Sequence, residues 1–158
     1  MKNKSIVIKI FAVGLLVLSI VFIFINSFQD VDASNQRSLA LLEIINDYLS
    51  DLGIKNLSNI VIRKIAHYME FFVLGVVSCV AIRMFVSKQK RIWVLIPLGI
   101  GLVVAITDEM FQFVSAGRTP RVLDVVIDFS GVLSAVLIYY VIIVVVKQIK
   151  RRKIDERK

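Results

Sequence analysis

The 24 residues from 123 to 146, LDVVIDFSGVLSAVLIYYVIIVVV, decide the fold class of this chain. Their last 18 residues carry no charge, and a helix of about 20 apolar residues spans the hydrocarbon core of a bilayer. The first turns of the same segment nevertheless contain Asp124 and Asp128. Because charges near bilayer depth are costly, this segment predicts a membrane span with a polar site at one end.

Three other apolar runs precede this segment, so spans are predicted at about 6–25, 66–86, 92–114 and 123–146. The first run also resembles a signal peptide, but it is longer than a typical signal core, and we interpret it as an uncleaved span. The pairs Gly101/Ala105 and Gly131/Ala135 would let helices approach closely. The 158 residues, 58% of them hydrophobic, therefore predict an all-α integral membrane four-helix bundle, with residues 1–158 forming a single domain.

The placement of charge predicts how the spans are oriented. The net charge of +8 comes from basic residues that flank the apolar runs, as membrane anchors do, which argues against nucleic-acid binding. Of the 20 basic residues, 14 lie at the N-terminus, in the 83–91 segment and in the tail 147–158. The positive-inside rule therefore predicts that both termini and this tail are cytoplasmic.

The loop between the first two spans has its own helical pattern and would face outward. Apolar residues recur at steps of three and four along one stripe, acidic residues form the opposite stripe, and Gly53 is a plausible stop. We expect an extracellular amphipathic helix that lies on the membrane surface as a brace or as a lid. Its apolar stripe is Leu42, Ile45, Leu49 and Leu52, and its acidic stripe is Glu43, Asp47 and Asp51.

In this topology three spans bring polar residues to the outer side. The 66–86 and 123–146 spans begin there, and the 92–114 span ends there. His67 and Glu70 are three residues apart and Asp108 and Gln112 are four apart, so each pair shares one helix face. We expect the polar side chains to turn from lipid toward the bundle interior and to form one layer. The candidate ligand-binding and catalytic residues are Lys64, His67, Glu70, Asp108, Glu109, Gln112, Arg118, Asp124 and Asp128.

Three kinds of chemistry fit such a layer. It could be a salt-bridge network that locks the helices together. It could bind an anionic head group, with Arg118 contacting a phosphate or carboxylate in a bidentate way. It could be catalytic, with His67 as general acid or base and Glu109 orienting it. No metal-binding spacing such as His-Glu-x-x-His occurs, so no metal ligand is assigned, and cofactor and enzymatic activity stay open.

Proton or ion transport is disfavoured by the one-sided distribution of these groups. A transport pathway needs polar groups through the bilayer. The inner halves of the spans offer only Ser78, Cys79, Tyr139 and Tyr140.

The order of the motifs resembles the VanZ-like family. The motifs are Lys64-x-x-His67-x-x-Glu70, Asp108-Glu109-x-x-Gln112, Gly117-Arg118 and Asp124-x-x-x-Asp128-x-x-Gly131. Many relatives have asparagine at the position of Asp128, so a strict need for charge there is not expected.

The resemblance implies a multi-pass protein of the bacterial cell membrane, in a family associated with reduced susceptibility to teicoplanin-type glycopeptides. We therefore expect binding or modification of a lipid-linked cell-envelope component at the outer leaflet, with membrane lipids as partners. The alternative is a structural or partner-binding membrane subunit.

Overall fold

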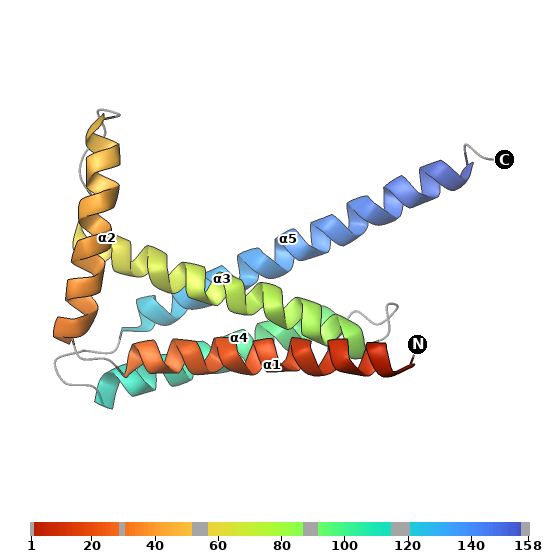
Figure 1. Ribbon diagram of the computed structural model, residues 1–158, viewed down its shortest axis with the longest axis horizontal. Coiled ribbons are helices and arrows are strands. Elements are labelled where there is room, and N and C mark those ends of the chain that lie inside the picture. Colours follow the sequence, from red (N-terminus) through yellow and green to blue (C-terminus); the bar gives the residue numbers. More distant parts are fainter. Residues whose placement is uncertain (1, 29–30, 52–56, 87–91, 115–120, 156–158) are drawn as a thin grey trace.

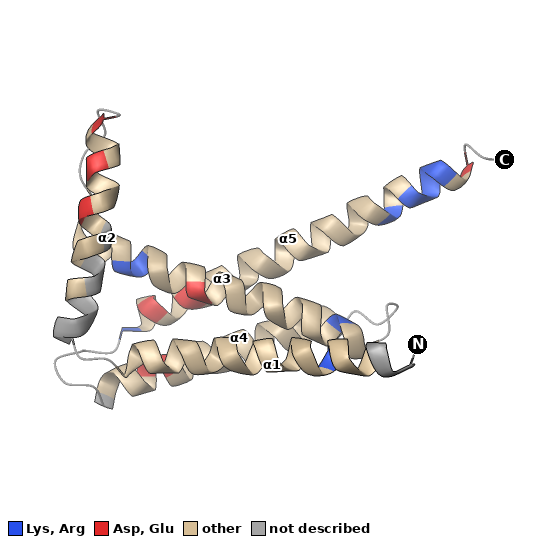
Figure 2. Ribbon diagram, in the orientation of Figure 1, with Lys and Arg blue, Asp and Glu red and all other residues tan. Residues whose placement is uncertain are grey.

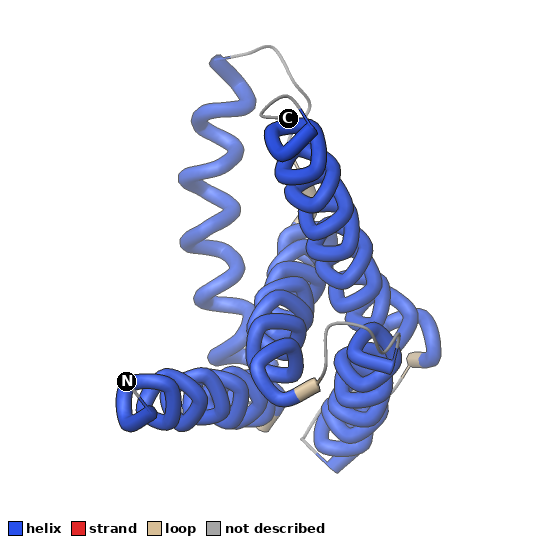
Figure 3. The backbone as a smooth tube through the Cα atoms, turned by 90° about the vertical axis from the view of Figure 1, so that its right-hand side faces the viewer, coloured by secondary structure: helices blue, strands red, loops and turns tan. Residues whose placement is uncertain are grey.

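The computed structural model describes residues 2–28, 31–51, 57–86, 92–114 and 121–155, and within these ranges every regular element is a helix (Figures 1 and 3). Four of the helices are long and apolar enough to cross a membrane, so the prediction of an all-α membrane bundle is confirmed. The helices are α1 (Lys2–Ser27), α2 (Val31–Asp51), α3 (Asn59–Phe85), α4 (Ile92–Val114) and α5 (Val122–Asp155).

The predicted and the observed helix bounds agree best for a span in which polar or interrupting residues flank both ends. Helix α4 has the predicted bounds, 92–114. Helix α3 begins at Asn59, upstream of the predicted start at 66, and therefore includes Arg63 and Lys64. Basic side chains are tolerated near a span's end because their long stems reach the interface, and the backbone gains hydrogen bonds by staying helical.

Helix α2 lies across one end of the bundle and packs against the start of α3 (Figure 1). Its predicted apolar stripe is partly buried at Leu42, Ile45 and Leu49, whereas Glu43, Asp47 and Asp51 are exposed. Asn46 connects α2 to the segment before α3, because its Oδ1 accepts a hydrogen bond of 2.8 Å from the backbone N–H of Leu57. The amphipathic helix is thus confirmed, and the predicted Leu52 and Gly53 lie outside the described residues.

The closest helix packing is between α3 and α5, and it depends on small residues. A Cβ placed on Gly75 would lie 2.7 Å from Cβ of Ala135, and one on Gly131 would overlap the backbone carbonyl of Tyr68. A Cβ on Gly101 of α4 would lie 2.6 Å from Val132. The predicted role of small residues in helix contacts is therefore confirmed for Gly131, Ala135 and Gly101.

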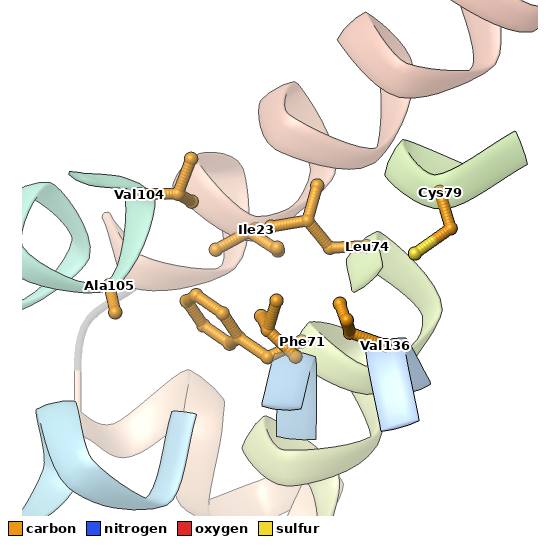
Figure 4. Close-up of a cluster of buried hydrophobic side chains, with 8 residues drawn as sticks. Ile23, Phe71, Leu74, Cys79, Val104, Ala105 and Val136 are labelled. Carbon is orange, nitrogen blue, oxygen red and sulfur yellow. The ribbon is translucent and has the colours of Figure 1, made fainter. Parts of the chain in front are cut away.

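A compact apolar core fills the centre of the bundle (Figure 4). Ile23 of α1, Phe71 and Leu74 of α3, and Val132 and Val136 of α5 are all 0–1% exposed. The core begins within one turn of the polar residues Ser27, Glu70 and Asp128, so apolar side chains lie directly beneath them. The exposed apolar side chains of the four long helices face outward, as expected for contact with lipid.

The other end of the bundle carries aromatic and basic residues. The guanidinium of Arg83 lies 4.8 Å from the centre of the Trp93 ring, and Tyr139 packs edge-on against the same ring at 5.8 Å. Tryptophan, tyrosine and arginine are typical of the membrane–water interface. From Val122 to Tyr140, α5 rises about 28 Å, close to the thickness of a bilayer core. Its basic final turns therefore extend past the membrane (Figure 2).

Candidate functional site

Four helices bring polar side chains to one end of the bundle, where α1 and α4 end and α3 and α5 begin; we call it the polar end. Figure 2 shows acidic residues gathered on this side and most basic residues on the opposite side. The long helices are apolar along most of their length, and in the described part of the chain most of their acidic residues lie at this end. Eight of the predicted site residues lie on α3, α4 or α5 at this end. They are Lys64, His67, Glu70, Asp108, Glu109, Gln112, Asp124 and Asp128.

At the centre of the polar end, three helices each place one titratable side chain. Nδ1 of His67 lies 3.7 Å from Oδ1 of Asp128 and 4.0 Å from Oδ2 of Asp108. The side chains of Asp108 and Asp128 are 0% and 2% exposed, and that of His67 is 24% exposed. One donor atom from each residue fits within 4.8 Å of the other two, so the group has the donor set of a metal site.

Asp108 is held by hydrogen bonds to both of its oxygens. Ser27 Oγ donates to Oδ1, and Nε2 of Gln112, one turn along the same helix, donates to Oδ2 at 2.9 Å. Both donors are buried. The predicted pairing of Asp108 with Gln112 on one helix face is therefore confirmed, and it fixes the direction in which the carboxylate points.

The end of α1 also belongs to the site, which the sequence interpretation missed. Ser27 reaches Asp108, and Nδ2 of Asn26 donates a 2.9 Å hydrogen bond to Oε1 of Glu70. A signal for both was present, because Asn26 and Ser27 are the first polar pair after the first apolar run. The predicted layer used only the last three spans, whereas the structure adds the first.

Glu109 stabilises the junction between α4 and α5. Its Oε1 accepts a hydrogen bond from the backbone N–H of Arg121, directly before α5 begins, and the side chain is 7% exposed. Glu109 is not part of the His67–Asp108–Asp128 group. Its observed contact is with the backbone of the α4–α5 connection, which the sequence did not indicate.

At the rim of the polar end, Lys64 and Asp124 form an ion pair of 3.1 Å. Both side chains are about one-third exposed, so the pair contributes about 0–1 kcal/mol. Asp124 also lies in the first turn of α5, where a negative charge is favoured by the helix dipole. The predicted anion contact Arg118 falls in 115–120, outside the described residues.

The match to known proteins covers all of these elements. A family model described as VanZ/LLP1 matches residues 11–144, which is most of the chain. The chain belongs to the VanZ/LLP1 family. The matched range includes every polar-end residue from Asn26 to Asp128, so the resemblance seen in the sequence motifs is confirmed. No curated protein and no solved structure matches the chain.

The polar end of this VanZ/LLP1 protein is rich in negative charge. The carboxylate of Asp128 interacts electrostatically with those of Asp108, Glu109, Asp124 and Glu70. Among the described residues, Lys64 pairs with Asp124 at the rim, and the side chain of Arg121 is exposed. Buried carboxylates in a membrane require a proton, a cation or a basic partner. The site therefore favours binding of a positive group at its centre and polar contacts at its rim.

Proposed function

We propose that the polar end is a binding site for the head group of a lipid-linked cell-envelope component. The observation that carries this proposal is the convergence of polar residues from four helices at one end of a bundle whose interior beneath them is apolar. A head group at the membrane surface would reach this layer from the side on which His67 is exposed, while the acyl chains of the same molecule would contact the exposed apolar sides of the helices.

The positive-inside rule supports placing this site at the outer leaflet. Arg83 in the last turn of α3 and the basic final turns of α5 lie at the opposite end of the bundle from His67 and Asp128 (Figure 2). The termini would then be cytoplasmic, and the polar end would meet envelope precursors on the outer face of a bacterial cell membrane. Altered access of teicoplanin-type glycopeptides to such precursors would be a consequence.

An anionic head group is the preferred ligand, and its positive contacts would come from the rim. Buried carboxylates repel an anion, so phosphate or carboxylate recognition needs Lys64 and Arg121, together with the contact predicted from the sequence for Arg118. Arginine suits this role because its planar fork binds two oxygens at once. His67, partly exposed at the centre, is the group able to transfer a proton if the bound component is modified.

A structural role is the second candidate, and two contacts favour it. The Lys64–Asp124 ion pair links α3 to α5, and the Glu109 contact with the Arg121 backbone links α4 to α5. In a helix-locking layer, a charged His67 would also pair with the buried Asp108 and Asp128. A fully buried histidine would suit that role better than one whose side chain is 24% exposed. Ion transport is disfavoured because Phe71, Leu74 and Val132 fill the space beneath the polar end.

Native mass spectrometry of the purified protein tests the head-group proposal. The probes are a polyprenyl phosphate, phosphatidylglycerol and phosphatidylethanolamine, each added to wild type, Arg118→Ala and the control Arg152→Ala on the basic tail. We expect wild type to retain the polyprenyl phosphate at least tenfold better than phosphatidylethanolamine. Arg118→Ala should lose at least tenfold in retention, because a bidentate charged contact is removed. Equal retention by wild type and Arg118→Ala, with Arg152→Ala equal to both, would contradict the proposal.

A further inference from the structure

We propose that His67, Asp108 and Asp128 together bind one divalent metal ion at the polar end. This inference goes beyond head-group recognition and does not depend on it. The three donors come from α3, α4 and α5, so the ion would join three helices at the point where two of them bury a carboxylate.

The distances within the group fit a metal better than direct hydrogen bonds. His67 Nδ1 lies 3.7 Å from Asp128 Oδ1 and 4.0 Å from Asp108 Oδ2. These separations exceed the roughly 2.7–3.2 Å of an N–H···O hydrogen bond. Donors around a tetrahedral ion with bonds of about 2.1 Å are about 3.4 Å apart. Small side-chain rotations therefore bring all three donors to one ion.

Hydrogen bonds from neighbouring side chains orient Asp108 in the way that metal ligands are commonly oriented. Ser27 and Gln112 hydrogen-bond to both oxygens of Asp108, and each oxygen keeps a further lone pair for an ion. Hydrogen bonds of this kind fix the direction of ligating carboxylates, and their loss typically weakens metal binding about 10–100-fold. The end of α1 thus supports the site without supplying a ligand.

Glu70 gives an independent indication of a missing partner. It lies one turn after His67 on α3, and its charge interacts with that of Asp108. Its Oε1 accepts the hydrogen bond from Asn26, but its Oε2 is buried and has no hydrogen-bond partner among the described residues. Such buried, unsatisfied oxygens are uncommon and indicate a nearby ion, water or proton. An ion at the centre would give Glu70 a nearby positive charge.

The concentration of buried negative charge also favours a bound cation. Asp108 and Asp128 are almost fully buried, and Glu70 and Glu109 add two carboxylates close by. A divalent cation offsets two of these charges at the point where they are most concentrated. Protonation of the carboxylates, or a contact from Arg118, would offset them differently, and the experiment below separates these outcomes.

The donor set indicates the class of metal. One imidazole nitrogen with two carboxylate oxygens suits Mn²⁺, Fe²⁺ or Zn²⁺ better than the all-oxygen preference of Mg²⁺ or the thiolate preference of Cu⁺. Three protein donors also leave coordination positions for water or for a ligand oxygen. The ion would therefore be accessible from the side on which His67 is exposed.

Metal titration of the full chain in detergent, without added lipid, tests the inference. After treatment with EDTA and its removal, Mn²⁺ binding is followed by electron paramagnetic resonance and Zn²⁺ binding by competition with a chromophoric chelator. We expect one ion per chain for wild type and at least a tenfold rise in Kd for His67→Phe and Asp128→Leu. Asp155→Leu, exposed at the far end of the same helix, is the matched control and should stay within threefold of wild type.

Wild type alone also decides the question if a variant fails to fold. Pulsed electron paramagnetic resonance of the Mn²⁺ complex should show coupling to one directly bound imidazole nitrogen. Absence of saturable binding by wild type, absence of this nitrogen coupling, or an equal loss of affinity in Asp155→Leu would each overturn the inference. Because no lipid is present, a failure here leaves the head-group proposal standing, and retention of lipid in EDTA would separate the two.

Discussion

Gly131→Leu is expected to prevent α3 and α5 from packing and to abolish the folded bundle. A Cβ at position 131 would overlap the backbone carbonyl oxygen of Tyr68 and lie 3.0 Å from the backbone nitrogen of Phe72. Backbone atoms in a helix cannot turn aside as a flexible side chain can. Overpacking typically costs about 1–3 kcal/mol for small insertions, so alanine should already destabilise the protein, and leucine should do so beyond recovery. Thermal unfolding in detergent, followed by circular dichroism, measures the effect.

The control for this prediction is Gly99→Ala, on α4. Nothing lies within 4 Å of a Cβ at Gly99, and alanine is a better helix former than glycine by about 0.5–1 kcal/mol. This variant should therefore be as stable as wild type or slightly more stable. A melting temperature for Gly131→Leu within 2 °C of wild type, the shift expected from about 0.5–1 kcal/mol, would show that α3 and α5 do not approach as described.

The second large effect is expected from removing charge at the centre of the polar end. The double variant Asp108→Asn/Asp128→Asn should be more stable than wild type in EDTA, by about 1–4 kcal/mol, as seen when buried charges are replaced by neutral groups. Asparagine keeps the shape of both side chains, and its oxygen still accepts the hydrogen bond from Ser27. Gln112 can turn its amide to remain paired. The repulsion between the two buried carboxylates disappears.

The same variant distinguishes a binding site from a salt-bridge layer that only locks the helices together, which we call a clasp. Added Mn²⁺ should raise the unfolding temperature of wild type and leave that of the variant unchanged, because binding to the folded state alone stabilises it. In a clasp, the aspartates are the necessary partners of a charged His67. Their removal would then cost about 3–5 kcal/mol, as for a broken buried ion pair. A loss of stability of that size in EDTA would favour the clasp over the site.

Hydropathy was sufficient to predict the fold because lipid leaves few alternatives to a helix. The bounds of α4 and the existence of α2 followed from the sequence pattern, since apolar runs and the Leu42–Ile45–Leu49 stripe are local features. The longer start of α3 did not follow. Arg63 and Lys64 were interpreted as flanking anchors, whereas they continue the helix and Lys64 reaches Asp124 on α5.

The sequence predicts the depth of the site residues in the membrane, but not how their side chains are arranged relative to one another. Helix order places His67, Asp108 and Asp128 at one depth, but their approach depends on the rotation of each helix about its axis. Glu109 illustrates this point, because adjacent residues point about 100° apart on a helix. While Asp108 points toward His67, Glu109 reaches the backbone of Arg121.

Spacing rules also could not indicate the metal group. Such rules detect ligands that are close in sequence, such as two histidines four residues apart on one helix. Here each donor comes from a different helix, and Ser27, which hydrogen-bonds to the donor Asp108, lies on a fourth. Only the packing of α1 against α3 and α4 brings these groups together.

Cysteine labelling in intact cells shows whether the polar end faces the outside of the cell. Cys79 is buried and is the only cysteine, so Cys79→Ser gives a clean background. Val122→Cys at the polar end and Ile154→Cys at the other end of α5 replace side chains that are 82% and 59% exposed, without changing charge. A membrane-impermeant maleimide should label the cysteine at 122 in intact cells and the cysteine at 154 only after permeabilisation. The reverse pattern would place the polar end in the cytoplasm and contradict the account.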